Sequence, residues 1–146
     1  MTARGTKPDK QARQMLLAAK LYSTRTRIAI VKVLLAAGRP LDKKEIAVRL
    51  GSNMPDAATV YRTLERLGSK GLVHRVYTGG RARRFELAHQ CGQVQCHPHF
   101  TCRRCGITRC LTDAKVPLVK GLQEGYRLLR QQVRLDGICP SCQPRR

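Results

Sequence analysis

Two Cys-x-x-Cys pairs give the C-terminal part of the chain the donor set of a metal site. The first pair is Cys102 and Cys105, and the second, Cys139 and Cys142, lies almost at the C-terminus. Zinc binds four thiolates tetrahedrally, and each Cys-x-x-Cys supplies two sulfurs from one tight turn. Gly106, directly after the first pair, suits the close backbone approach of such a turn. The spacing therefore predicts one structural Zn²⁺ per chain.

A second cluster of soft ligands lies between Cys91 and His99. Because side chains alternate along a strand, His97 and His99 share one face and their imidazoles can reach the same ion. Cys91 is a third candidate, placed where one ion could join two parts of the chain. A closed tetrahedral site needs a fourth ligand. The candidates for it are Cys110 and Glu86 first, and then His89, Cys96 and His74.

The composition limits the class of protein. The 146 residues suffice for one ordinary domain or two small ones. A formal charge of +20 predicts attraction to a polyanion, and 42% hydrophobic residues exclude a disordered basic tail. No secretory signal is visible, and no apolar run approaches the roughly 18 residues of a membrane span. Seven cysteines in such a chain favour metal thiolates over disulfides, so we expect a reducing cytoplasm and no membrane.

The first part of the chain has the pattern of helices followed by a hairpin. N-cap residues, apolar periodicity and glycine stops predict four helices. They run from Asp9 to about Leu21, from Ser23 or Thr24 to Gly38, from Asp42 to Gly51, and from Asp56 to Gly71. Two strands follow at 72–77 and 83–87, and paired glycines between them supply the positive φ of a hairpin turn. This is the order of a winged helix.

A smaller region follows a seam near residues 88–96. There we expect short strands within 100–110, a helix near 116–125 and a strand at 126–135. A unit of about 50 residues buries little surface, so a zinc ion and a second copy of the chain would both stabilise it. We predict an α+β chain with a winged helix in 1–88, a hinge in 89–96 and a small α/β metal-binding dimerisation domain in 97–146.

The fourth helix indicates which polyanion the chain binds. A recognition helix uses its N-terminal residues on base edges, and Ala57 and Thr59 are small enough to enter a major groove. Tyr61 offers a ring edge to a thymine methyl, and Arg62 offers a fork that fits guanine O6 and N7. Basic side chains of the wing and the N-terminus can neutralise phosphates, namely Arg81, Arg83, Arg84, Lys7, Lys10 and Arg13. The predicted partner is double-stranded DNA.

Three motifs in this order resemble the ferric uptake regulator superfamily, and within it the zinc uptake regulators. They are ATVYRTL at 58–64, GLV at 71–73, and His97-x-His99-x-x-Cys102-x-x-Cys105-Gly. The resemblance runs from about residue 10 to Cys142. It implies a metal-dependent homodimeric repressor that binds AT-rich palindromes upstream of metal-uptake genes. It also implies a structural site at the four paired cysteines, and a hinge cysteine, here Cys91, beside the two histidines.

Departures from the family pattern bear on the metal. The common His-His-Asp-His segment reads Cys96-His97-Pro98-His99 here, and Gln131 stands where many members have a further histidine. The loop at 38–40 lacks the histidine that iron and peroxide sensors often contribute. Thiolates favour zinc, whereas iron sites prefer nitrogen and oxygen. We therefore expect Zn²⁺ as the co-repressor, with an Fe²⁺- or peroxide-responsive regulator as the alternative.

Two interpretations from other classes stay open. In a zinc enzyme, Cys91, His97 and His99 would hold a catalytic ion. No glutamate adjoins the histidines as a general base and no His-Glu-x-x-His motif is present, so we predict that the chain is not an enzyme. A nonspecific nucleic-acid-binding protein, stabilised by its four-thiolate zinc, would also be strongly basic. Metal-dependent and sequence-selective binding distinguishes the regulator from that protein.

Overall fold

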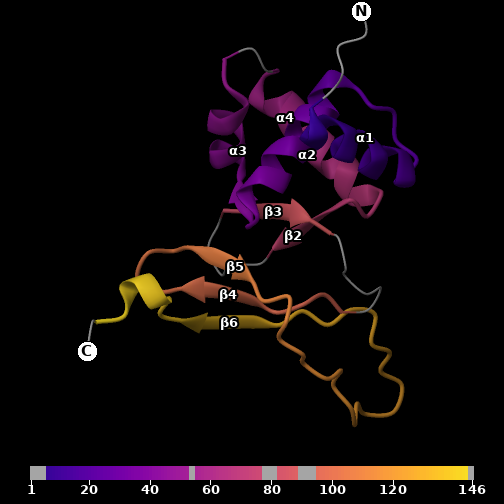
Figure 1. Cartoon of the computed structure of the whole chain (residues 1–146). Coiled ribbons are helices and arrows are strands. Elements are labelled where there is room, and N and C mark those ends of the chain that lie inside the picture. The colour runs from indigo at the N-terminus through magenta and orange to yellow at the C-terminus, as the bar shows by residue number, and fades with distance from the viewer. Residues whose placement is uncertain (1–5, 53–54, 77–81, 89–94, 145–146) are drawn as a thin grey trace, which may run out of the picture. The chain divides into compact units, whose positions relative to one another are not determined.

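The computed structural model describes residues 6–52, 55–76, 82–88 and 95–144. The chain divides into two compact units, 1–89 and 90–146 (Figure 1). Within the described ranges, the first unit holds every α-helix, and each unit holds one three-stranded sheet. This mixture of helix and sheet confirms the α+β class. None of the helices in these ranges is long and apolar enough to cross a bilayer.

The first helix, α1 (Lys7–Ala18), differs from the prediction at both ends. Thr6 is its N-cap, so Asp9 lies inside the first turn and forms an ion pair with Lys32 of the next helix at 2.6 Å. A carboxylate in the first turn is still favourable because it faces the positive end of the helix dipole. The helix stops before the predicted end because Lys20 adopts a left-handed conformation, with φ 56°.

Three further helices each begin directly after the residue predicted to be the N-cap. They are α2 (Arg25–Ala37), α3 (Lys43–Leu50) and α4 (Ala57–Ser69). Thr24, Asp42 and Asp56 each accept a hydrogen bond from the backbone N–H three residues further on. Each bond satisfies one donor that a helix start leaves without an intrahelical partner. Gly38 ends α2 with φ 58°, a conformation that costs glycine little.

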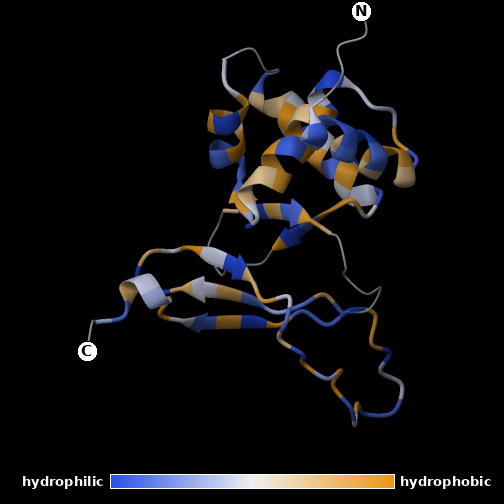
Figure 2. Ribbon diagram, viewed as in Figure 1, coloured by the Kyte–Doolittle hydropathy of each residue, from blue (hydrophilic) through white to orange (hydrophobic). Residues whose placement is uncertain are grey.

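The apolar stripe of α4 faces the core of the first unit. Its predicted members Val60, Leu64 and Leu67 are at most 3% exposed and pack in one cluster with residues of α1, α2 and the sheet. Figure 2 shows apolar residues gathered on the sides where these helices face one another. Burying one such side chain contributes about 1.5–3 kcal/mol, so the stripe determines which face of α4 stays exposed.

A three-stranded sheet completes the first unit and confirms the winged helix. The predicted hairpin strands are β2 (Val73–Val76) and β3 (Arg84–Leu87), which pair antiparallel. Their predicted glycine turn lies outside the described residues. The sequence did not predict β1 (Leu41–Asp42), which pairs with the other edge of β3. Two residues are too few for a detectable alternation of apolar and polar side chains.

The second unit contains a smaller sheet with the order β5-β4-β6. Its strands are β4 (His99–Cys102), β5 (Thr108–Cys110) and β6 (Arg134–Gly137). β4 pairs antiparallel with β5 and parallel with β6, and a short 3-10 helix, η1 (Pro140–Cys142), follows β6. The strands expected within 100–110 are therefore present, whereas the last strand starts eight residues later than the predicted 126.

The helix predicted near 116–125 is absent, because residues 111–133 form an extended loop with short turns. Gly121 and Gly125 have φ of 73° and 85°, which no right-handed helix contains. The side chain of Gln131 fastens the loop, since it accepts from the Val119 N–H at 2.7 Å and donates to the Pro117 carbonyl at 3.0 Å. The apolar residues Leu118, Val119 and Leu122 of the predicted helix are exposed, and so are Tyr126 and Leu129 of the strand predicted after it.

Candidate metal centres and nucleic-acid interface

The four paired cysteines come together at the C-terminal end of β4. The sulfurs of Cys102, Cys105, Cys139 and Cys142 all lie within 4.8 Å of one another. Cys105 and Cys139, from different pairs, have their sulfurs 3.8 Å apart. Four sulfurs about 2.3 Å from a tetrahedral Zn²⁺ would be separated by about 3.8 Å. The spacing of this cluster therefore fits a four-thiolate zinc ion.

The backbone brings these two cysteine pairs side by side. Cys102 pairs with Gly137 in the parallel β4–β6 ladder, and the Arg103 N–H donates to the Gly137 carbonyl at 2.8 Å. After the first pair the chain turns at Gly106, whose φ is 73° and whose N–H donates to the Cys102 carbonyl at 2.9 Å. The pairing of β4 with β6 thus joins cysteines that lie more than 30 residues apart in the sequence.

Two thiols of this cluster have pKa values shifted in opposite directions. The backbone N–H of Cys105, followed by those of Cys139 and Arg104, lowers the pKa of the Cys102 thiol to about 6. Hydrogen bonds with Cys139 and then Cys105 raise the pKa of Cys142 to about 12. Four sulfurs this close cannot all ionise without a cation among them, because thiolates repel one another. A bound dication would supply that charge, as zinc requires deprotonated thiols.

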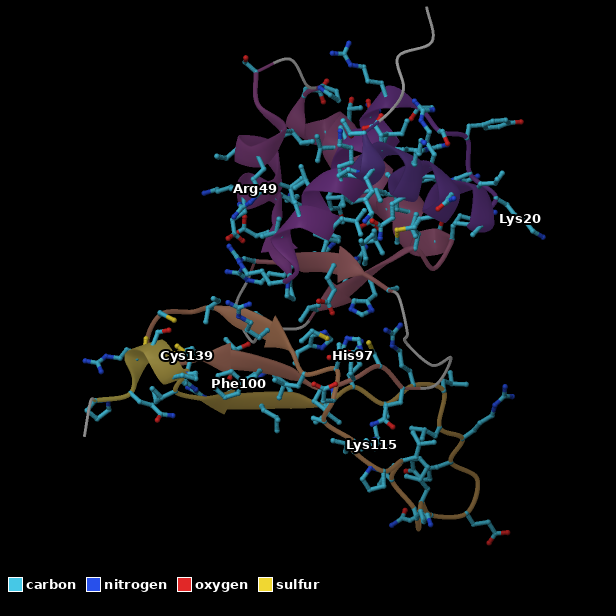
Figure 3. All side chains as sticks on the ribbon, viewed as in Figure 1. Lys20, Arg49, His97, Phe100, Lys115 and Cys139 are labelled. Atoms are coloured by element: carbon cyan, nitrogen blue, oxygen red, sulfur yellow. The ribbon has the colours of Figure 1, made fainter. Side chains whose placement is uncertain are left out.

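A second cluster lies at the other end of β4. The ligand atoms of His97, His99 and Cys110 lie within 4.8 Å of one another. His99 and Cys110 are direct partners in the β4–β5 ladder and so share a face of the sheet. The His97 and His99 ring centres are 5.5 Å apart, with the rings tilted by 58°. Figure 3 labels His97 and Cys139, which mark the two clusters at opposite ends of β4.

The other predicted ligands of a regulatory metal are placed differently. Cys91 and His89 lie outside the described residues. Cys96 is buried and disulfide-bonded, so in this state it offers no thiolate, although the cysteine pattern favoured metal thiolates over disulfides. Glu86 and His74 belong to the first unit, where they face each other across β2 and β3. The Glu86 Oε1 and the His74 Nε2 are 2.6 Å apart.

On the first unit, the residues expected to read DNA form part of an exposed surface. Ala57 is exposed in the first turn of α4, and the exposed Arg62 donates to the Thr59 hydroxyl at 3.2 Å. Tyr61 is half-buried, and its hydroxyl accepts a hydrogen bond from Arg83 at 2.8 Å. α4 therefore presents the small and polar side chains that its N-terminal turns were predicted to offer.

The basic residues predicted to meet phosphates are not equivalent. Arg83 is exposed, whereas Arg84 is half-buried and forms an ion pair with Glu45 at 2.9 Å. Arg13 is exposed on α1, beside a cleft of about 330 Å³. Arg81 lies outside the described residues. Lys7 and Lys10 are exposed on the first turns of α1.

Glu45 is a structural residue that was not singled out from the sequence. Its carboxylate accepts from the Asp42 N–H, from Arg39 and from Arg84. Partial burial would raise the pKa of Glu45, but these donors outweigh burial and lower it below the usual 4.5. The pattern Asp42-x-x-Glu45 is a capping box and was the available signal. Glu45 thereby joins α3 to the wing strand.

Comparisons with known proteins agree with this arrangement. The model of the family described as "Ferric uptake regulator family" matches residues 18–134. The ferric uptake regulation protein of Synechococcus elongatus is 30% identical over 114 residues, which cover 75% of this chain and 76% of the relative. The transcriptional regulator FurA of Mycobacterium tuberculosis is 28% identical over 134 residues, covering 88% of each chain.

Solved structures show the same fold. A zinc uptake regulator in complex with zinc and DNA superimposes with a TM-score of 0.66 at 20% identity, covering 94% of this chain and 96% of that one. The ferric uptake regulator of Helicobacter pylori gives 0.60 at 20% identity and covers 99% of both chains. The match to the family model over most of the sequence confirms the resemblance to the ferric uptake regulator superfamily. This chain belongs to the ferric uptake regulator family of metal-responsive transcriptional regulators.

Proposed function

We propose that this protein is a zinc-responsive repressor, which binds a palindromic operator as a homodimer when its second metal site is filled. The observation that carries the proposal is the donor set at the N-terminal end of β4, where Cys110 lies with His97 and His99. Sulfur beside two imidazoles favours zinc over the harder iron. Several relatives are named as ferric regulators, so an iron-responsive regulator is the alternative.

In this proposal the two clusters hold metals with different tasks. The four-thiolate cluster holds a structural Zn²⁺, because its four sulfurs already lie together and two backbone N–H groups donate to the Cys102 sulfur. The His97–His99–Cys110 cluster holds the regulatory ion, with Cys91 as the fourth ligand expected from the sequence. Glu86, already bound to His74, is the alternative ligand. A regulatory site must exchange its ion, so fewer prearranged ligands suit that task.

The DNA contact is assigned to the first unit. Residues 1–89 carry 19 Lys and Arg against 6 Asp and Glu, a net charge of +13. We assign Ala57, Thr59, Tyr61 and Arg62 to the groove, and the exposed basic residues of α1 and the wing to phosphates. In a dimer, two such helices would read half-sites roughly one helical turn apart. The exposed apolar loop at 118–129 supplies the surface for contact between two copies.

Regulation follows from thermodynamic linkage. If the ion binds the DNA-competent state more tightly than the incompetent one, it raises DNA affinity by the same factor by which DNA raises metal affinity. A typical coupling of about 1–3 kcal/mol corresponds to roughly a 5- to 150-fold switch. We place the protein in the cytoplasm, where the chain finds both its operator and reduced thiols.

A gel-shift titration of the reduced full-length chain tests the proposal. Operator binding is measured with Zn²⁺, with Fe²⁺ under anaerobic conditions, and after removal of the loosely bound ion by chelator. The proposal expects Zn²⁺ to tighten binding to an operator-like palindrome more than to a random duplex. Equal stimulation by Fe²⁺ alone would assign the iron alternative. Metal-independent binding without sequence preference would leave a nonspecific nucleic-acid-binding protein.

A further inference from the structure

Tyr61 of α4 contacts two cations that come from different elements of the first unit. Arg83, just before β3, donates from its guanidinium to the Tyr61 hydroxyl at 2.8 Å. Lys43, the first residue of α3, places its ammonium 4.8 Å from the centre of the Tyr61 ring. A cation within about 6 Å of an aromatic ring centre is attracted by the ring quadrupole. One tyrosine side chain therefore contacts both Lys43 and Arg83.

These contacts leave both positive charges available. The tyrosine hydroxyl and ring are neutral, so neither cation is neutralised, and both side chains are exposed. Nearby arginines differ, because Arg84 is paired with Glu45 and Arg75 with Glu65. Among the described residues of the wing, Arg83 is thus the exposed arginine without a carboxylate partner. A long basic side chain that is not already held in place loses conformational freedom when it binds a phosphate, and this loss weakens binding.

We propose that Tyr61 is a positioning residue that holds Arg83 and Lys43 ready for two phosphates of the DNA backbone. The hydroxyl orients the guanidinium and the ring orients the ammonium, so part of the ordering precedes binding. This role is separate from any contact of Tyr61 with a base. It rests on the proposed DNA-binding function, and it predicts that removal of one neutral hydroxyl changes an electrostatic property of the complex.

The test measures the affinity of the full-length, metal-loaded protein for a random-sequence duplex over a range of salt concentrations. Tyr61→Phe, Arg83→Ala and the double variant are compared with the wild type. The logarithm of the binding constant falls as the logarithm of the salt concentration rises, and loss of one phosphate contact makes this slope shallower by about 0.9. We expect Arg83→Ala to lose close to this amount and Tyr61→Phe to lose part of it, and both to weaken binding about 3- to 10-fold, the range for one lost hydrogen bond. The double variant should be no weaker than Arg83→Ala alone.

Two matched controls exclude general effects of these substitutions. Tyr22→Phe removes a hydroxyl from a side chain that is 87% exposed, and Arg66→Ala removes an exposed arginine of α4. Tyr22→Phe should leave affinity and slope unchanged. Arg66→Ala should leave intact the effect of Tyr61→Phe when the two are combined. Thermal unfolding of each variant confirms that the first unit is folded.

The outcomes separate this inference from the proposed function. If Tyr61→Phe leaves the slope unchanged, or weakens binding equally in the Arg83→Ala background, Tyr61 does not position Arg83 and the inference is wrong. If the wild type binds all duplexes equally and without metal, the proposed regulator is wrong, while the coupling between Tyr61 and Arg83 can still hold. If the wild type binds no duplex at all, both are overturned.

Discussion

Two clusters of candidate metal ligands lie at the two ends of β4, one of four cysteines and one of two histidines with a cysteine. At the C-terminal end, backbone N–H groups of Arg104 and Cys139 both donate to the Cys102 sulfur at 3.4 Å, and the strand ladder aligns the two pairs. At the N-terminal end, His99 and Cys110 meet as a cross-strand pair, and His97 joins them from the segment before β4 rather than from the strand in which the sequence predicted it. The first cluster is complete within one unit, and the second takes three described ligands from that same unit. This difference suits a permanent ion at one end and an exchangeable ion at the other.

The largest expected effect comes from breaking the four-thiolate cluster. Cys102→Ser should abolish the tightly held ion and unfold the second unit, because structural zinc contributes about 10–16 kcal/mol in small zinc domains. Native mass spectrometry with metal analysis reports the number of ions per chain, and circular dichroism reports the fold. Cys110→Ser is the matched control and should keep one tightly bound ion. If both variants lose the fold equally, the division into two kinds of site fails.

A smaller effect is expected from the other end of the strand. His97→Ala should remove the second ion and the metal-dependent gain in DNA affinity, roughly 5- to 150-fold, while the protein stays folded. Isothermal titration with Zn²⁺ and gel shifts with and without Zn²⁺ measure these two losses. Gln132→Ala, an exposed substitution in the same unit, serves as the control. If Zn²⁺ raises the DNA affinity of His97→Ala as much as that of the wild type, His97 is not a ligand of the regulatory ion.

The smallest expected effect tests whether the stability of the first unit depends on the carboxylate of Glu45. Glu45→Gln should weaken the contacts with Arg39 and Arg84 and cost about 1–2 kcal/mol of unfolding free energy at neutral pH. Because the folded-state pKa of Glu45 lies below 4.5, its contribution is complete above that pH and is lost as the pH falls through the folded value. Urea unfolding at neutral and acidic pH measures the difference, which should shrink in acid. A constant difference would mean that the charge of Glu45 is not what stabilises the unit.

Local signals predicted the first unit well. Thr24, Asp42 and Asp56 were recognisable as N-caps because a short polar side chain before an apolar stripe satisfies a free backbone donor. The apolar stripe of α4 was also predictable, because helical periodicity involves residues only three or four positions apart. Asp9 was misread because Thr6 stands before it and Pro8 favours an earlier start. The helix expected near 116–125 was wrong because apolar spacing outweighed two glycines that the chain places at positive φ.

The sequence by itself determined the donor types, the Cys-x-x-Cys spacing, the helix starts and the charge, because each depends on residue identity or on neighbours a few positions away. Only the tertiary structure decided which distant residues meet. The β4–β6 ladder joins the two cysteine pairs, the β4–β5 ladder brings Cys110 to His99, and the packing of α3, α4 and the wing brings Lys43 and Arg83 to Tyr61. Such contacts form because strand register and core packing bring distant segments together, and no local pattern records that choice.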